Sequence, residues 1–294
     1  MLDISQNVSL ASYTTWLVGG AAEYFFLPQN LGELQAAVLW ARERELPVTI
    51  LGGGSNVLVS DAGVKGLVIC MKKMTGTEIE EKNGFLHIKA MAGTSKSELL
   101  KIFLKYKLAP ALFLAGLPGD VGGGVVMNAG VAEKFEPREF EEIIEFVDVL
   151  KHDGAVVRYP KEKLNWNYRH SSGWEPGIVV SVGIRWRMQI KQDILNQVKA
   201  ANKIRLSKQP LDLPSCGSVF INPQGHKAAQ LIDSCGLKGF RIGGAEVSLK
   251  HANFIVKIGE AKASDFLDVI THVQKTVLKE KNIQLKTEVV KFGF

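Results

Sequence analysis

A glycine-rich turn is the first part of the chain whose residue types suggest chemistry. Gly52, Gly53 and Gly54 lie between two apolar runs, residues 48–51 and 57–59, and are followed by Ser55 and Asn56. Glycine tolerates positive φ and exposes its backbone N–H group, so such a turn can cradle an anion. A dinucleotide-binding fingerprint of the Rossmann type opens a helix after its glycines, whereas β-branched residues follow here. The pattern predicts a strand–turn–strand phosphate cradle, and an ordinary glycine hairpin is the alternative.

A second glycine cluster spans residues 115–130. Six of these sixteen residues are glycine, and Asp120 is the only charged one. A flexible linker would be polar, so we expect a buried segment whose backbone lies near a large ligand. Two such loops fit a pyrophosphate attached to a flat ring system, as in flavoproteins that hold FAD in an α+β domain.

Three polar residues outside the loops are candidates for reaction chemistry. Ser218 follows Gly217, and a serine can donate a proton only where its alkoxide is stabilised or its proton is relayed. Arg169 lies in the aromatic-rich segment 166–171, and arginine binds carboxylates in a bidentate way. Glu288 lies in the largely apolar segment 285–290. From the residues alone, the alternatives are a serine in a turn, an arginine stacked on an aromatic ring, and an edge glutamate.

Five segments occur in an order that is typical of one family: residues 15–20, 51–59, 116–130, 168–171 and 217–223. On these motifs the chain resembles the UDP-N-acetylenolpyruvoylglucosamine reductases from about residue 14 to residue 288. The resemblance implies an α+β fold, with an FAD-binding region of the vanillyl-alcohol-oxidase/PCMH type and a C-terminal α+β substrate-binding domain. The short spacing from Ser218 to Glu288 is similar to that of the subclass without a tyrosine loop over the substrate.

The resemblance also implies an activity in peptidoglycan precursor synthesis, in which NADPH reduces FAD and the substrate is an enolpyruvyl ether of a UDP-sugar. The absence of histidine and cysteine from both glycine loops predicts that the FAD is bound non-covalently. Hydride reaches C3 of the enolpyruvyl group, and Ser218 is the expected proton donor to C2. Arg169 and Glu288 are expected to stabilise the enolate between these steps, with Glu288 protonated in an apolar site. Lys208 and Asn222 are expected to bind the substrate. The expected cofactor-binding residues are Leu51, Gly52, Gly53, Gly54, Ser55, Asn56, Pro118, Gly119, Gly122, Gly123, Asn128, Ala129 and Gly130.

The chain departs from the family pattern at three places. Ile221 stands where a lysine is usual, Ala21 stands where a proline is usual, and residues 131–138 replace an aromatic-glycine-acid run. An FAD-dependent oxidase of the same superfamily is the alternative function. Its covalent members carry histidine or cysteine at the flavin loops, and neither glycine cluster here contains one. A non-enzymatic nucleotide-binding or nucleic-acid-binding protein is a third possibility.

Composition narrows the class of protein. The chain has 294 residues, of which 46% are hydrophobic, and a net charge of +6. It contains no apolar run long enough to span a membrane. The basic bias suits anionic small molecules, and the even spread of Lys and Arg argues against nucleic acid. Three cysteines without metal spacing, six scattered histidines and no basic-apolar leader predict a cytoplasmic protein without a metal site. A monomer is expected.

Apolar periodicity and breaker residues predict the elements. We expect an FAD-binding region over residues 1–190, in two lobes split near residue 70, and a substrate-binding domain over 200–294. Expected helices are 32–46, a serine-capped helix from Ser95 or Ser97 to about 107, 192–206, 227–234, and a Ser264-capped helix to about 281. Expected strands are 48–51, 85–91, 143–150 paired with 155–158, 178–187, 253–258 and 284–291.

Overall fold

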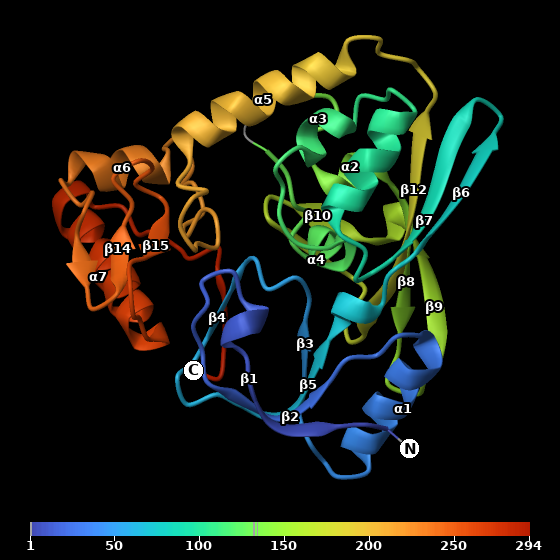
Figure 1. Cartoon of the computed structure of the whole chain (residues 1–294), viewed down its shortest axis with the longest axis horizontal. Helices are drawn as coiled ribbons and strands as arrows, with labels where there is room; N and C mark the ends of the chain where they lie inside the picture. Colours follow the sequence, from blue (N-terminus) through green and yellow to red (C-terminus); the bar gives the residue numbers. More distant parts are fainter. Residues whose placement is uncertain (1, 132, 134) are drawn as a thin grey trace. The chain divides into compact units, whose positions relative to one another are not determined.

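The computed structural model describes residues 2–131, 133 and 135–294, and the chain separates into two compact units (Figure 1). Of the described residues, unit 1 contains 2–4, 25–53, 67–131, 133 and 135–204, and unit 2 contains 5–24, 54–66 and 205–294. The first glycine turn therefore changes unit between Gly53 and Gly54. Part of the 131–138 segment, Ala132 and Lys134, lies outside the described residues.

Unit 1 is built on a five-stranded antiparallel sheet with the strand order β6-β7-β12-β8-β9 (Figure 1). Its strands are β6 (Thr77–Lys82), β7 (Phe85–Met91), β8 (Ile144–Leu150), β9 (Val156–Pro160) and β12 (Ile178–Arg187). In β7 the side chains alternate, so that Leu86, Ile88 and Ala90 are buried while their neighbours are partly exposed, as expected for a half-buried strand. The predicted strands 85–91 and 178–187 and the predicted hairpin are confirmed.

Helices accompany this sheet, and side-chain caps start three of them. The helices of unit 1 are α1 (Leu31–Arg42), α2 (Lys96–Lys105), α3 (Ala111–Leu114), α4 (Val121–Val126) and most of α5 (Ile194–Lys208). The Ser95 side chain accepts a hydrogen bond from Glu98 N, so the predicted serine cap is confirmed. Helix α1 ends four residues earlier than predicted, because the chain turns through Glu45 at φ +54° before Pro47.

A four-stranded sheet and a short hairpin lie outside the five-stranded sheet. A four-stranded sheet has the order β1-β2-β5-β3, with β1 (Ser5–Ser9), β2 (Ala21–Phe26), β5 (Val64–Cys70) and β3 (Val48–Leu51). Strand β3 runs parallel to the second half of β5, which places Leu51 beside Cys70. The hairpin of β10 (Asn165–Asn167) and β11 (His170–Ser172) presents Tyr168 and Arg169 in its turn.

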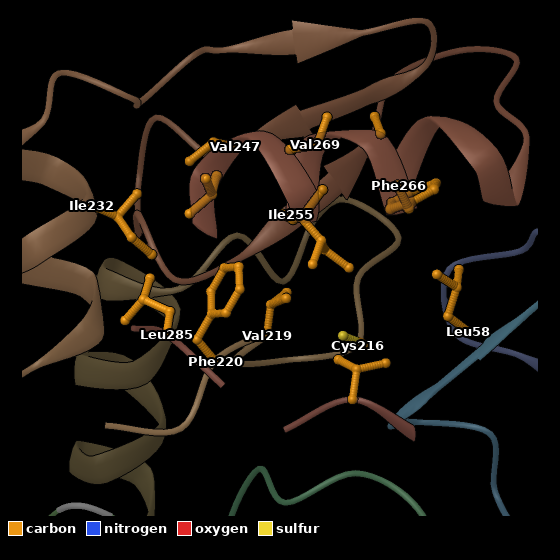
Figure 2. Packing of buried hydrophobic residues seen from close by; sticks show 14 of the residues in the cluster. Leu58, Cys216, Val219, Phe220, Ile232, Val247, Ile255, Phe266, Val269 and Leu285 are labelled. Atoms are coloured by element: carbon orange, nitrogen blue, oxygen red, sulfur yellow. The ribbon is translucent and has the colours of Figure 1, made fainter. Parts of the chain in front are cut away.

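Unit 2 gathers the C-terminal third around one apolar core, shown in Figure 2. Its elements there are α6 (Ala228–Ser234), α7 (Ala263–Lys281), the three-stranded sheet of β13 (Arg241–Ile242), β14 (Ala245–Val247) and β15 (Ile255–Lys257), and the parallel pair β4 (Val57–Val59) with β16 (Val290–Phe292). Phe266 and Val269 of α7 lie in this core with Phe220. Trp16 also belongs to it: its ring packs against Phe266 in a tilted arrangement with the ring centres 4.7 Å apart, and its indole N–H donates to the Ile255 carbonyl at 2.7 Å.

Two details of unit 2 correct the sequence-based expectations. Helix α7 begins at Ala263, so Ser264 lies inside the first turn and cannot be its cap; the carboxylate of Asp61 accepts from the N–H groups of Ala263 and Ser264 at 2.7 and 2.9 Å. The predicted last strand, 284–291, is reduced to β16. The segment before it pairs with a different strand, and Thr287 forms a bridge with Phe220. The chain bonds to Val219 at Glu288 and to Asn56 at Val290, so the two parts do not form one continuous strand.

Candidate active site

The two glycine clusters meet in unit 1. A Cβ atom built on Gly53 would lie 2.8 Å from the Cα atom of Gly119, and one on Gly52 would lie 2.6 Å from the Asp120 Oδ2 atom. Only glycine allows this approach of the two backbones. The structure thus brings Gly52 and Gly53 of the first loop together with Gly119 of the second, which were predicted to serve one ligand.

Backbone pairing with the segment before α2 fixes the second loop. Ser95 and Asp120 form an antiparallel bridge, and Gly122 N donates to the Ala92 carbonyl at 2.8 Å. Asp120 then caps α4, because its Oδ1 atom accepts from Gly123 N at 2.8 Å. The second cluster is therefore a turn followed by a one-and-a-half-turn helix rather than an irregular loop.

Asn128 and Arg169 brace the end of the second loop. The Asn128 amide donates to the Asn167 carbonyl at 3.1 Å and accepts from Glu141 N at 3.0 Å. The Arg169 guanidinium donates to the Gly130 carbonyl at 2.9 Å, and its Nη1 atom lies 3.6 Å from a Glu139 carboxylate oxygen. It also stacks 4.6 Å from the centre of the Tyr168 ring. These contacts hold the guanidinium in one orientation beside the glycine loop.

The remainder of the first loop belongs to unit 2, where Asn56 is joined to the segment that carries Glu288. Asn56 Nδ2 donates to the Glu288 carbonyl at 3.1 Å, and Val290 N donates to the Asn56 carbonyl at 3.0 Å. The parallel pairing of β4 with β16 continues directly beyond these bonds. Asn56 thus extends the strand pair by one residue and fixes the backbone of Glu288.

The segments that carry Ser218 and Glu288 pair through a short antiparallel contact of their backbones. Glu288 N donates to the Val219 carbonyl at 2.8 Å, and Ile221 N donates to the Lys286 carbonyl at 3.0 Å. Residue 218 therefore lies next in the chain to the residue that pairs with Glu288. Both side chains are half-buried.

Asn253 supports the Ser218 segment from its other side and was missed by the sequence analysis. Its buried side chain accepts from Phe220 N at 2.9 Å and donates to the Phe220 carbonyl at 2.8 Å, and its own carbonyl accepts from Val219 N. A polar residue within the apolar run 252–256 was the available signal. A buried amide that saturates a backbone in this way fixes its position.

Cys216 shows the low polarity at this end of unit 2. Burial raises the pKa of its thiol well above 9.0, and the nearby Glu288 carboxylate raises it further. The thiol is therefore neutral at physiological pH and acts as a small apolar neighbour of Glu288.

The two expected substrate-binding residues lie at the surface of unit 2. Lys208 is the exposed last residue of α5. Asn222 is also exposed, and its Oδ1 atom accepts from Ala228 N at 2.9 Å at the start of α6.

The glycine loops fit a dinucleotide cofactor such as FAD. Glycine backbones form the surface where the loops meet, so no side chain of Gly52, Gly53 or Gly119 shields their amides from a phosphate.

Comparison with known proteins decides the family. Residues 22–159 match the family model "FAD binding domain", and residues 209–292 match "UDP-N-acetylenolpyruvoylglucosamine reductase, C-terminal domain". The chain is 37% identical to the reductase of that name from Pediococcus pentosaceus, covering 98% of this chain and 94% of the relative. It is 40% identical to the reductase from a Synechococcus strain, covering 99% and 95%. The chain belongs to the UDP-N-acetylenolpyruvoylglucosamine reductase family.

A solved structure of the reductase family agrees with this assignment. The crystal structure of the reductase from Thermus caldophilus matches with a TM-score of 0.79 and 33% identity over 99% of both chains. The expected fold class, an FAD-binding region with a C-terminal α+β domain, is thereby confirmed. Among the described residues, no helix has the length and apolar character needed to cross a membrane.

One buried ionic group near the glycine loops was also missed from the sequence. Lys96 and Asp120 are each 5% exposed. Asp120 was recognisable as the single charge in the second cluster, but its depth was not. Nothing in the amphipathic pattern of α2 distinguishes Lys96 from its exposed lysines.

Proposed function

We propose that this chain catalyses the NADPH-dependent, FAD-mediated reduction of UDP-N-acetylenolpyruvoylglucosamine to UDP-N-acetylmuramate, a step of peptidoglycan precursor synthesis. Membership of the reductase family supports the reaction. The observation that supports the proposal is the backbone hydrogen bond from Glu288 N to the Val219 carbonyl, which joins the segment that carries Ser218 to the segment that carries Glu288.

Ser218 is the proton donor in this proposal. When bound, FAD supplies the redox chemistry, taking a hydride from NADPH and giving one to C3 of the enolpyruvyl group. The Ser218 hydroxyl then gives its proton to C2 and regains one from solvent. The bonds to Asn253 and Glu288 hold its segment still during this transfer, which favours a well-placed acid.

Arg169 and Glu288 stabilise the negative charge that develops at C2. The Arg169 guanidinium is already oriented by Gly130, Glu139 and Tyr168, so it can bind the substrate carboxylate without reorganisation. Glu288 acts in its protonated form as a hydrogen-bond donor to the enolate. The buried Cys216 side chain gives this place an apolar neighbour, and an apolar surrounding is what keeps a carboxyl neutral.

Binding roles complete the proposal. FAD is held by residues of both glycine loops: Leu51–Asn56, Pro118, Gly119, Gly122, Gly123, Asn128, Ala129 and Gly130. Asn128 contributes its backbone, because its side chain is hydrogen-bonded to Asn167 and Glu141. Lys208 meets the substrate diphosphate as a compact positive charge. Asn222 binds the sugar nucleotide.

Ser218→Ala tests the proposal, because it separates the two half-reactions. Reduction of the flavin by NADPH requires no proton at C2, so bleaching in a stopped-flow experiment should proceed at the wild-type rate. Reoxidation by the enolpyruvyl substrate should slow by about 10²–10⁴-fold, the usual contribution of a general acid.

Ser234→Ala is the matched control, since Ser234 is an exposed serine on α6. Both of its half-reactions should run at the wild-type rate. If Ser218→Ala slows both half-reactions equally, or neither, Ser218 does not deliver the proton.

Three further properties are part of the proposal: a non-covalent flavin, a monomer and a cytoplasmic location. The family relatives support a reductase over the oxidase alternative. An oxidase would consume oxygen rapidly after reduction without the enolpyruvyl substrate, whereas a reductase would sustain NADPH consumption beyond one equivalent of flavin only when that substrate is present. Light scattering of the purified protein checks the monomer.

A further inference from the structure

A buried carboxylate lies directly beneath the first glycine turn of unit 1. Asp120 Oδ1 is bound by Gly123 N, whereas Oδ2 faces Gly52, at 2.6 Å from a Cβ built there. Burial raises the pKa of Asp120, and the backbone N–H groups of Gly123 and Gly53 together with the charge of Lys96 only partly offset it.

A buried ammonium group accompanies this carboxylate. Lys96 Nζ donates to the Pro118 carbonyl at 2.8 Å and lies 5.6 Å from the centre of the Phe140 ring. Burial lowers the pKa of Lys96 to about 8, Asp120 acts to raise it, and Arg169 acts to lower it further. Lys96 N also donates to the Gly119 carbonyl at 3.1 Å, and Ser95 forms a bridge with Asp120. Lys96 and Asp120 thus lie in one buried region, in which each acts electrostatically on the other.

We propose that Lys96 neutralises the charge of Asp120 so that the glycine turn can bind the diphosphate of the cofactor. The inference rests on the proposed function only in taking FAD as the ligand. Asp120 has a structural task, because it caps α4 and lies against Gly52. Its negative charge at that place would repel a diphosphate. Lys96, held at Pro118 within the same loop, compensates for that charge.

Electrostatics at low dielectric gives the reason. Two charges interact far more strongly inside a protein than in water, so an unpaired carboxylate next to the cradle would oppose an anion. A buried charge is tolerated when a partner of opposite sign accompanies it and is costly when that partner is removed. The pair therefore keeps the capping geometry without its electrostatic cost.

The other titratable groups around the pair are few. Cys70 of β5 is buried and its thiol pKa is raised by burial, with Asp120 adding to the shift. Arg169 contributes positive charge near Lys96, and Glu139 forms an ion pair with Arg169. Cys70 and the Arg169–Glu139 pair are present unchanged in every variant below.

A double-mutant cycle tests the proposal, with FAD affinity of the apoprotein measured by fluorescence as the readout. Lys96→Met keeps the apolar stem and removes the charge, and Asp120→Asn keeps the shape and removes the opposite charge. We expect Lys96→Met to weaken FAD binding at least about tenfold. The double variant should return to within about threefold of Asp120→Asn, because neither charge is then uncompensated. Lys101→Met, at an exposed position of α2, should bind as the wild type does.

A pH series gives a second readout that the loss of a structural contact would not change. In Lys96→Met, lowering the pH protonates Asp120 and should restore part of the FAD affinity. The double variant should lack this recovery. If Lys96→Met does not fold but the double variant does, that rescue supports charge compensation as well.

Several results would overturn the proposal. They are wild-type affinity in Lys96→Met, a double variant as weak as Lys96→Met, or a folding failure in both. Wild-type affinity would mean that Lys96 plays no part in FAD binding, and either of the other two results would mean that it acts through its bond to Pro118 rather than through its charge. A wild-type protein that binds no FAD at all would instead overturn the proposed function.

Discussion

At the scale of single residues, Arg169 shows how two interpretations of one side chain can hold together. It stacks on Tyr168, as the structural alternative expected, and it also bonds to Gly130 at the end of the second glycine loop. Its backbone is left-handed, with φ +58°, in the tight turn between β10 and β11. Stacking, loop contact and turn all fix the direction of the guanidinium.

Arg169→Lys should separate charge from geometry. Lysine keeps the positive charge but loses the planar fork that holds a carboxylate in two places. We expect FAD content close to the wild type and turnover lowered by about 10²-fold, comparable with loss of one donor to an oxyanion. Steady-state kinetics and the flavin absorbance of the purified variant measure the two effects. Arg185→Lys, an exposed arginine over Phe85, is the control, and wild-type turnover in Arg169→Lys would remove Arg169 from the reaction.

Lys96 should make stability depend on pH at alkaline values. Its pKa is about 8 in the folded protein, against 10.5 without burial. The unfolded chain therefore binds this proton more tightly, and the destabilisation present below about pH 8 is relieved as the pH rises toward 10.5. To keep Asp120 from titrating, Asp120→Asn is compared with Asp120→Asn/Lys96→Met. Between about pH 7 and about pH 10 we expect the unfolding free energy of Asp120→Asn to rise relative to that of Asp120→Asn/Lys96→Met. If the difference between the two variants does not depend on pH, Lys96 is not desolvated.

At the scale of elements, the start of α7 depends on a residue far away in the sequence. The Asp61 carboxylate accepts two N–H groups of the first turn, at Ala263 and Ser264. Partial burial tends to raise the pKa of Asp61, but these hydrogen bonds outweigh it and the net shift is downward. The stabilisation is therefore present above the ordinary carboxyl pKa and is lost as the pH falls through the lowered value.

Asp61→Ala should lower the unfolding free energy by about 1 kcal/mol, the usual value of a helix cap. The variant should also lose less stability than the wild type on acidification, since the capping carboxylate is absent. Urea unfolding at neutral and acid pH measures both effects. Asp268→Ala, at an exposed position of α7, should change stability little, and an equal loss in both variants would argue against the cap.

At the scale of the whole molecule, FAD should stabilise the fold by mass action. A ligand that binds only the folded chain adds about 2.7 kcal/mol at a hundredfold excess over its Kd. The thermal midpoint should rise with FAD concentration, and acid precipitation should release all flavin into the supernatant. Riboflavin, which lacks the diphosphate, is the control and should shift the midpoint less. A midpoint independent of added FAD, or flavin left in the pellet, would contradict non-covalent binding.

The accuracy of the sequence-based fold follows from how local each signal is. Strands 85–91 and 178–187 and the Ser95 cap are as predicted, because alternation and capping depend on neighbouring residues. The predicted start of α7 and the predicted extent of the last strand are wrong. Each depends on a partner distant in the sequence, Asp61 in one case and Phe220 in the other.

By itself the sequence determined the family, the positions of both glycine loops, and Ser218, Arg169 and Glu288 as candidates, because residue types and their order carry that information. Only the tertiary structure decided how these parts are held. The contact of Gly53 with Gly119, the pairing of Glu288 with Val219, and the burial of Lys96 beside Asp120 each join segments that are remote along the chain. Burial and electrostatic coupling arise from such non-local packing, which no local pattern of residues records.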